Sequence, residues 1–247
     1  MFAHDATSNS WTCRALLMAG GRSERMRATT GVHKALMHIQ GIPLIEWNIR
    51  ALVANNFRDI VVAVPSVSAE IDAFLRGRGA ELAAEAGATV ACIREASPLG
   101  TIGAARVACR DADAVLVVNV DNLTTLPLRA LAVSHRESHA DLTIASHHEP
   151  FRLPFGQLVI ADGVVMEYRE KPEFPVVVSS GTYVVSKAAA QLIVPDRRFD
   201  ITHLFTAAKA GGLLVRAFAH SSTWIDVNDE AALRRAEEVF GGASPAK

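Results

Sequence analysis

The 247-residue sequence has few cysteines and no excess of charge of either sign, and each shortage excludes a class of protein. Its three cysteines, Cys13, Cys92 and Cys109, are an odd number without a CxxC spacing, which argues against a disulfide framework and against a zinc or dithiol site. The 25 basic and 26 acidic residues leave a formal net charge of −1, so we expect no nucleic acid partner. Any anionic ligand would have to be bound by a local group of cations.

Long apolar runs and targeting signals are also missing. No apolar run approaches the roughly 20 residues that span a bilayer, and residues 1–10 lack a cationic segment followed by an apolar one. We therefore expect no membrane partner and a cytoplasmic location. The sequence predicts a single domain over 11–240, with flexible termini at 1–10 and 241–247.

What is present is an alternation of short apolar runs with longer helical segments. Runs rich in β-branched residues occur at 15–19, 60–64, 89–93 and 114–120. This alternation predicts a parallel sheet covered by helices. Two of the helices are expected to begin at prolines, which suit the first helical turn: Pro43 and Pro127.

After residue 140 the pattern changes to strands that lie close together in the chain. Strand-like segments occur at 141–148, 155–171 and 175–186, and Asp162-Gly163 marks a tight hairpin turn. These segments predict antiparallel or mixed strands. The remaining expected elements are a helix at about 199–210, a strand at 213–220 and an amphipathic helix at 228–240.

The loop after the first strand combines two glycines with arginines. Gly20 and Gly21 permit close approach to the backbone, whose amides can bind phosphate oxygens, and Arg22, Arg25 and Arg27 outnumber Glu24. The GxGxxG pattern fails because Ser23 occupies the second glycine position, and the chain has no GxxxxGK[ST] motif. Taken alone, the loop is either a phosphate site or a solvated turn.

Two carboxylates follow apolar runs that are far apart in the sequence. Asp121 and Asn122 come directly after the run 114–120, and Asp226 follows a short run before the last helix. Two carboxylates at one sheet edge would suit Mg²⁺, which can also bridge the phosphate oxygens of a nucleotide. The alternative is that Asp121 starts a turn and Asp226 belongs to the turn before the helix, where Asn228 or Asp229 is the more natural N-cap.

Other catalytic patterns are not indicated. The histidines show no ligand spacing, and the adjacent pair His147-His148 would point in opposite directions on a strand, so we interpret the histidines as mostly surface or structural. No GxSxG elbow or comparable nucleophile context suggests a hydrolase.

The opening ALLMAGGRSERMR, followed by His33-Lys34-Ala35-Leu36, resembles the start of the sugar nucleotidyltransferases, in which GGxGTRM or GGxGTRL precedes a Pro-Lys pair. This resemblance implies a Rossmann-like three-layer α/β/α fold of the GT-A type, with a mixed central sheet and a small antiparallel sheet on the acceptor side. The sequence departs from the family pattern at Ser23, Glu24 and His33. A carboxylate at position 24 would repel a triphosphate unless it points away or pairs with an arginine.

Further segments extend the resemblance along the chain. The segment PLGTIGA is similar to a family segment that lines the nucleobase, and FGQLVIADGVVMEYREKP is similar to the family's acceptor strands. The nucleotide site implied in this way contains Ala19, Gly20, Gly21, Arg22, Ser23, Glu95 and Gly100. The acceptor site contains Asn122, Gly156, Glu170, Lys171, Ser180 and Gly181; the catalytic residues are Arg25, Lys34, Asp121 and Lys171; and the metal ligands are Asp121 and Asp226.

The expected activity is transfer of a nucleoside monophosphate from an NTP, with GTP first, to a sugar 1-phosphate or a cyclitol phosphate. Pyrophosphate would be released, and Mg²⁺ is the expected cofactor. Two alternatives stay open: a cytidylyltransferase that acts on a non-sugar phosphate or phosphonate, and a regulatory homologue that binds nucleotides without catalysis. The sequence also leaves homodimer formation open.

Overall fold

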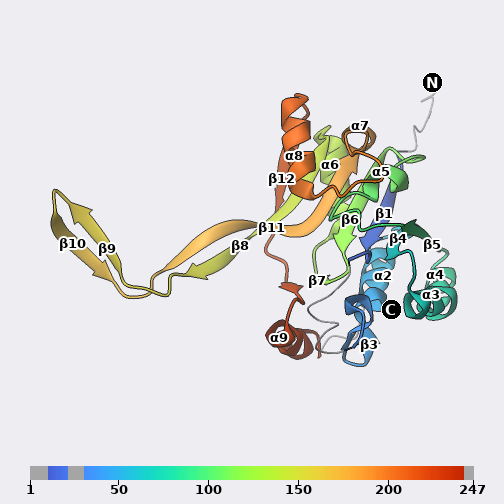
Figure 1. Ribbon diagram of the computed structural model, residues 1–247, viewed down its shortest axis with the longest axis horizontal. Helices are drawn as coiled ribbons and strands as arrows, with labels where there is room; N and C mark the ends of the chain where they lie inside the picture. Colours follow the sequence, from blue (N-terminus) through green and yellow to red (C-terminus); the bar gives the residue numbers. More distant parts are fainter. Residues whose placement is uncertain (1–10, 22–30, 242–247) are drawn as a thin grey trace, which may run out of the picture.

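The computed structural model describes residues 11–21 and 31–241, and within them seven strands form a mixed sheet in the order β12-β8-β11-β6-β1-β4-β5 (Figure 1). The strands β1 (Cys13–Met18), β4 (Asp59–Pro65), β5 (Thr89–Glu95) and β6 (Ala114–Asn119) are mutually parallel. Beyond β6, strand β11 (Glu173–Ser186) is antiparallel to both its neighbours, β6 and β8 (Leu142–Arg152), and β12 (Val215–Ala219) is parallel to β8.

Helices cover both faces of this sheet because its central strands are apolar on both sides. In β1, Ala15 and Leu17 face one core, whereas Leu16 and Met18 face the other. The first core is closed by α2 (Leu44–Ala54), α3 (Ala69–Phe74), α4 (Ala80–Glu85) and α6 (Leu128–Glu137). The second is closed by α5 (Ala105–Ala108), α7 (Lys187–Ala190) and α8 (Ile201–Ala210). The expected three-layer α/β/α fold with a mixed sheet is confirmed.

Local signals explain several helix boundaries. Pro43 and Pro127 stand directly before the first residues of α2 and α6, as N-caps rather than inside the first turn. The turn between α3 and α4 is a π-helical segment, η2 (Leu75–Gly79), which joins them into one nearly continuous helix. None of the helices that the structure describes could cross a membrane, because none is both long and apolar enough.

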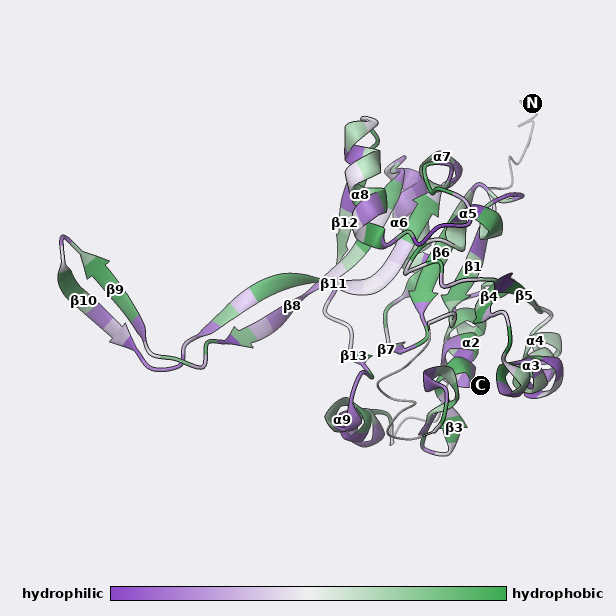
Figure 2. Cartoon of the chain, viewed as in Figure 1, coloured by the Kyte–Doolittle hydropathy of each residue, from purple (hydrophilic) through white to green (hydrophobic). Residues whose placement is uncertain are grey.

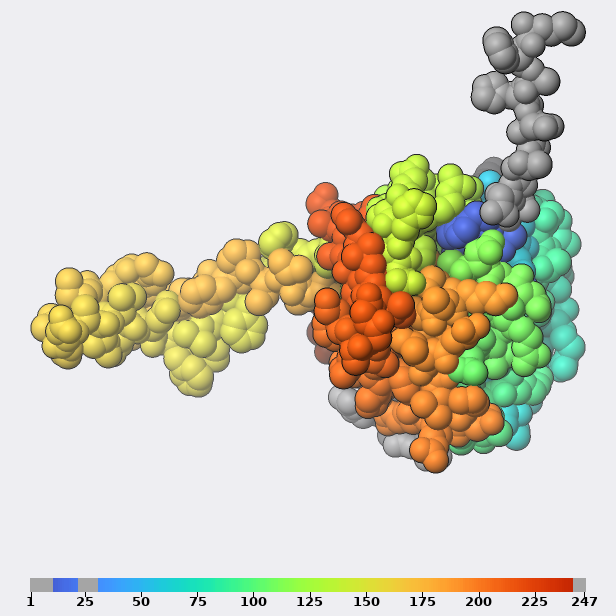
Figure 3. All heavy atoms as spheres, turned by 90° about the horizontal axis from the view of Figure 1, so that it is seen from above, coloured from blue at the N-terminus to red at the C-terminus, as the bar shows by residue number. Residues whose placement is uncertain are grey.

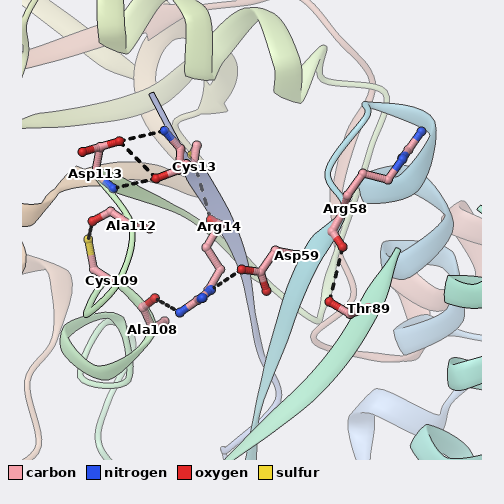
Figure 4. A network of polar contacts seen from close by, with 10 residues as sticks. Cys13, Arg14, Arg58, Asp59, Thr89, Ala108, Cys109, Ala112 and Asp113 are labelled. Carbon is pink, nitrogen blue, oxygen red and sulfur yellow. Dashed lines mark hydrogen bonds and ion pairs between the residues drawn. The ribbon is translucent and has the colours of Figure 1, made fainter. Parts of the chain in front are cut away.

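The amino-terminal edge of the sheet is fixed by polar contacts (Figure 4). The Arg14 Nε donates to Asp59 Oδ2 at 2.7 Å and Arg14 Nη1 donates to the Ala108 carbonyl at 2.9 Å, so β1 is tied to β4 and to α5. Asp113 Oδ2 accepts from the Thr12 amide at 2.8 Å. These contacts lie at the opposite end of the strands from the loops that the sequence singles out.

A third, smaller core lies beneath the carboxyl-terminal edge. It joins β2 (His38–Ile39), β3 (Ile42–Pro43), β7 (Asn122–Thr124), β13 (Trp224–Asp226) and α9 (Glu230–Phe240). Strand β13 pairs antiparallel with β7, and Trp47 on α2 packs edge-on against Phe240, with ring centroids 5.7 Å apart. This core brings the C-terminal part of the chain to the end of β6.

Strands β8 and β11 continue far beyond the sheet and carry a hairpin at their end (Figures 1 and 3). The hairpin consists of β9 (Gln157–Ala161) and β10 (Val164–Arg169), paired antiparallel. Asp162 and Gly163 join them with φ of 48° and 79°, so the tight turn expected at these residues is confirmed. The small antiparallel sheet is therefore present, at the tip of a long extension.

Candidate functional site

The parallel order of the strands brings the predicted loops to one edge of the sheet. β1 and β6 pair in register up to Met18 and Asn119, so the Gly20 loop and Asp121 both emerge at the carboxyl ends of neighbouring strands. Ala19 is buried and its amide donates to the Ala63 carbonyl at 2.9 Å, which continues the sheet by one residue beyond β1. Ligands of open α/β sheets bind at such an edge.

At this edge, Lys34 connects two loops that are distant in the sequence. Its Nζ lies 2.7 Å from Asp121 Oδ2 and also donates to Asn228 Oδ1, whose side-chain amide in turn contacts Asp226 Oδ2. The Val227 amide donates to the Asp121 carbonyl at 2.9 Å and fixes β13 against the end of β6. Asp121, Lys34 and Asp226 are thus brought together as the sequence predicts, with Asn228 between them.

The local chain around Lys34 explains how it is held. Lys34 begins a short 3₁₀ turn, η1 (Lys34–Leu36), and His33 caps that turn by accepting from the Ala35 amide through Nδ1 at 3.2 Å. The other ring nitrogen of His33 lies 3.0 Å from the Gly21 carbonyl. His33, which departs from the family pattern, therefore links the Lys34 turn to the glycine loop.

The carboxylates fit a divalent cation. Burial, with the nearby Asp121 carboxylate adding to it and Lys34 opposing it, raises the pKa of Asp226 to about 6. Asp226 Oδ1 is buried and accepts no hydrogen bond from the described residues. A cation bound here would satisfy that oxygen. The described residues contain no group of three or more His, Cys, Asp or Glu with metal-site geometry, so phosphate oxygens and water would complete the coordination of Mg²⁺.

Gly20 and Glu95, both predicted to bind the nucleotide, lie against each other. Glu95 ends β5 and is only 3% exposed, and its carboxylate occupies the space where a Cβ of Gly20 would lie. Burial raises the pKa of Glu95, and the Leu99 amide, which donates to Oε2 at 3.3 Å, opposes that shift. Glu95 Oε1 has no hydrogen-bond partner among the described residues. An unsatisfied carboxylate oxygen beside the glycine loop is available to a ligand.

Gly100 has a packing role that can exist alongside nucleotide binding. Its φ is 81°, and a Cβ there would lie 2.6 Å from Asp200 Oδ1 and 2.7 Å from the Phe199 carbonyl. Asp200 also accepts from the Thr101 amide at 3.0 Å. The glycine is thus required for close packing of this loop against the start of α8.

Asn122, Ser180 and Gly181, predicted to contact the acceptor, are in contact with one another. Asn122 Nδ2 donates to the Ser180 carbonyl at 2.8 Å, and a Cβ at Gly181, whose φ is 66°, would overlap the same amide. The register shift of β11 against β8 between Ser179 and Tyr183 creates this irregular backbone. It lies beside β7, next to Asp121.

Gly156, Glu170 and Lys171 are not brought to this edge by their own chain. They flank the hairpin at the end of the β8–β11 extension, which leaves the body of the molecule (Figures 1 and 3). Within the extension, Tyr168 packs over Gly156 and donates from its hydroxyl to Glu170 Oε2 at 3.2 Å. The predicted site residues Arg22, Ser23 and Arg25 lie outside the described residues, as does Glu24, which departs from the family pattern.

Sequence reasoning did not assign a role in the site to Asn228 or to two histidines. Asp229 caps α9 by accepting from the Ala232 amide at 2.7 Å, which leaves Asn228 free for Lys34 and Asp226. His147 and His220 both lie within hydrogen-bond distance of Ser180 Oγ, at 2.8 and 2.7 Å. His147 also packs on Trp224, whose Nε1 donates to the Ser180 carbonyl at 2.8 Å. The buried His147 and the half-buried His220 thus hold the Ser180 side chain in place.

Comparison with known proteins assigns the family. Residues 15–199 match the model of the MobA-like NTP transferase domain. The chain is 24% identical over 250 residues to the bifunctional protein GlmU of Geotalea uraniireducens, covering 92% of this chain and 52% of that protein. It is 28% identical over 192 residues to a mannose-1-phosphate guanyltransferase of Yarrowia lipolytica, covering 73% of this chain and 51% of the relative.

The chain spans about half the length of the curated relatives that it matches.

Solved structures share the fold. HddC from Yersinia pseudotuberculosis, complexed with GMP-PN, superposes with a TM-score of 0.69 at 22% identity, and the match covers 92% of this chain and 99% of HddC. A Bacillus anthracis protein assigned provisionally as a glucose-1-phosphate thymidylyltransferase superposes with a TM-score of 0.73 at 20% identity, covering 96% and 98% of the two chains. Because the match covers most of its length, the chain belongs to the MobA-like NTP transferase family, a family of nucleotidyltransferases.

Proposed function

We propose that this protein transfers a nucleoside monophosphate from an NTP to a sugar 1-phosphate or a sugar-like cyclitol phosphate. The observation that carries the proposal is the contact of Lys34 Nζ with Asp121 Oδ2 at 2.7 Å, next to the half-buried Asp226, at the edge where the Gly20 loop emerges. A cation between two carboxylates and a glycine loop is suited to two phosphorylated substrates, which repel each other in the absence of positive charge.

The reaction requires positioning more than covalent chemistry. An oxygen of the acceptor phosphate attacks the α-phosphorus of the NTP and forms a new P–O bond, while the bond from the α-phosphorus to the bridging oxygen breaks and pyrophosphate leaves. Holding both substrates in line can contribute roughly 7–11 kcal/mol. Lys34 would stabilise the charge on the reacting phosphates, and the Gly20 and Gly21 amides would bind the triphosphate. Asp121 and Asp226 would hold Mg²⁺, which neutralises phosphate charge when bound.

GTP is the nucleotide that we propose first. One relative is a mannose-1-phosphate guanyltransferase, and HddC was solved with GMP-PN. We propose a sugar or cyclitol phosphate as the acceptor because Phe155-Gly156 and Glu170-Lys171-Pro172 resemble the family's acceptor strands, a resemblance that does not distinguish ring oxygen from ring carbon.

Pyrophosphate release, measured with each NTP and a panel of sugar 1-phosphates and cyclitol phosphates, tests the proposal. We expect the highest rate with GTP and a fall of about 100-fold or more in the Asp121→Asn variant, because several kcal/mol of charge stabilisation are lost. Asp111→Asn is the matched control, because Asp111 is exposed and lies outside the site. Unchanged turnover in Asp121→Asn would overturn the assigned site.

The same assay separates the alternatives. Turnover restricted to CTP with phosphocholine or a phosphonate would assign a cytidylyltransferase for a non-sugar acceptor. Nucleotide binding by calorimetry without turnover on any acceptor would assign a non-catalytic regulatory protein instead.

A further inference from the structure

The extension formed by β8, β11 and the β9–β10 hairpin has a surface that its own chain does not cover. We call residues 149–177 the arm. In Figure 3 the arm stands out from the body, and it is only two strands wide along its length. Two-stranded hairpins without packing are at best marginally stable in water. The arm therefore requires a surface to pack against.

Many residues of the arm are hydrophobic (Figure 2), and much of this apolar surface is exposed. Among the described residues, eighteen large hydrophobic side chains are exposed, and eleven of them lie between Phe151 and Val177. Phe155 is 71% exposed. Exposed apolar patches of this extent mark interaction surfaces in soluble proteins.

One face of the hairpin is formed by four large apolar side chains. Val165 pairs with Ile160 and Tyr168 pairs with Leu158, so these four side chains point to the same side of the two strands, and they are 46–64% exposed. The opposite face is mixed, because it has Val159, Ala161 and Val164 beside Gln157 and the ion pair between Glu167 and Arg169 at 2.6 Å. A hairpin with one continuous apolar face suits packing against another surface.

The arm also carries two of the predicted acceptor residues, Glu170 and Lys171. Ser180 lies seven residues after Glu173, the first residue of β11, which corresponds to roughly 23 Å at about 3.3 Å per residue, and Lys171 comes two residues before β11. Lys171 adopts a φ of 45°, which is uncommon for a residue other than glycine and places it in a defined turn before Pro172. At the sheet edge, the ammonium of Lys34 is already in contact with Asp121 and Asn228. Glu170 and Lys171 lie away from this edge in their own chain, which leaves the edge of a second copy as the place for them to act.

We propose that the protein forms a symmetric dimer in which each arm crosses to the second copy, lays its apolar face on it, and brings Glu170 and Lys171 to that copy's acceptor site. Exchange of an identical element between two copies gives a closed assembly and covers both arms at once. At that edge Lys171 would supply a cation for the acceptor phosphate, as the proposed function requires. Dimer formation stands on the arm itself, whereas the shared site rests on the proposed function.

Sedimentation velocity tests the dimer without reference to activity. We expect a dimer for the wild-type chain and a monomer for Val165→Asp, which puts a charge on the apolar face. Val164→Asp is the matched control, because Val164 is adjacent and similarly exposed, at 61% against 54%, but lies on the opposite face. Circular dichroism verifies that each variant is folded. A wild-type monomer, or a dimer that persists in folded Val165→Asp, would overturn the proposal.

Mixing two inactive variants tests the shared site. Asp121→Asn alters the body and Lys171→Ala alters the arm, so after refolding as a mixture about a quarter of wild-type activity should return, from the one intact site in each mixed dimer. Asp121→Asn mixed with Lys34→Ala is the control, because both lesions are in the body and no intact site can form. If the wild-type enzyme is active but the mixture of Asp121→Asn with Lys171→Ala recovers no activity, site sharing is overturned. A wild-type enzyme inactive on every acceptor would count against the proposed function and leave the sedimentation result standing.

Discussion

Gly20 and Gly21 are neighbours in the chain, yet a side chain would fit at only one of them. A Cβ atom at Gly20 would overlap the Glu95 carboxylate, whereas a Cβ at Gly21 would meet no heavy atom of the described residues within 4 Å. We predict that Gly20→Ala lowers the free energy of unfolding by about 1–3 kcal/mol, as overpacking does, and that Gly21→Ala changes it by less than about 0.5 kcal/mol. Urea unfolding followed by circular dichroism measures both values.

The Glu95→Ala variant serves as the control for this contact. It removes the atoms that a Cβ at Gly20 would strike, so Gly20→Ala should have almost no effect on stability in that background. An equal loss of stability in both backgrounds would show that the contact with Glu95 is not the cause.

At the residue scale, the sequence is most informative where chain order alone places a side chain. Asp121 follows a buried strand, and the ends of parallel strands share an edge, so its position could be predicted. Asn228 could not, because its position before α9 equally suits an N-cap, and only the structure shows that Asp229 takes that role. The contact of His147 with His220 depends on which strands pair, which periodicity does not specify.

At the scale of single elements, α6 contains a buried histidine that makes stability depend on pH. His135 is 3% exposed, and its Nδ1 lies 2.9 Å from Thr143 Oγ1. Burial lowers the pKa of His135 from its ordinary value of 6.5 to about 4, with Asp141 opposing the shift. Below pH 6.5 the unfolded chain binds a proton that the folded chain refuses, so stability falls as the pH drops from 6.5 towards 4.

This effect should reach about 3 kcal/mol by pH 4 and be absent above pH 7. We expect His135→Gln to flatten that part of the pH dependence, measured as the free energy of unfolding in urea at pH 7.5, 6 and 5. His148→Gln is the control, because His148 is an exposed residue on β8. A His135→Gln variant whose stability declines as steeply as that of the wild type would contradict this role for the burial of His135.

The elements themselves differ in how well they could be predicted. The central strands are apolar on both faces and are bounded by turn residues, so their positions follow from the sequence. The hairpin turn at Asp162-Gly163 was equally clear, because both residues tolerate positive φ. The direction of the arm cannot be predicted in this way. A sequence period of two shows which residues share a face of a strand but not where the strand leads.

For the molecule as a whole, the two edges of the sheet have different chemistry. The amino edge is closed by internal ion pairs such as Arg14 with Asp59, so its charges are satisfied within the fold. The carboxyl edge contains Asp226 and Glu95, each with a buried carboxylate oxygen that accepts no hydrogen bond from the described residues. Unsatisfied buried groups reduce stability, and a ligand that satisfies them should stabilise the folded state.

Nucleotide and Mg²⁺ together should therefore raise the melting temperature. At a ligand concentration 100 times the dissociation constant, binding contributes about 2.7 kcal/mol, which corresponds to roughly 5–10 °C for a chain of this size. We expect the increase to be largest with GTP, to fall when a chelator removes Mg²⁺, and to lose its Mg²⁺-dependent part in Asp121→Asn. Differential scanning fluorimetry with each NTP measures these shifts. A shift of the same size in Asp121→Asn, with and without chelator, would mean that the nucleotide binds without a cation at Asp121, and that the carboxyl edge is stabilised by the phosphates alone.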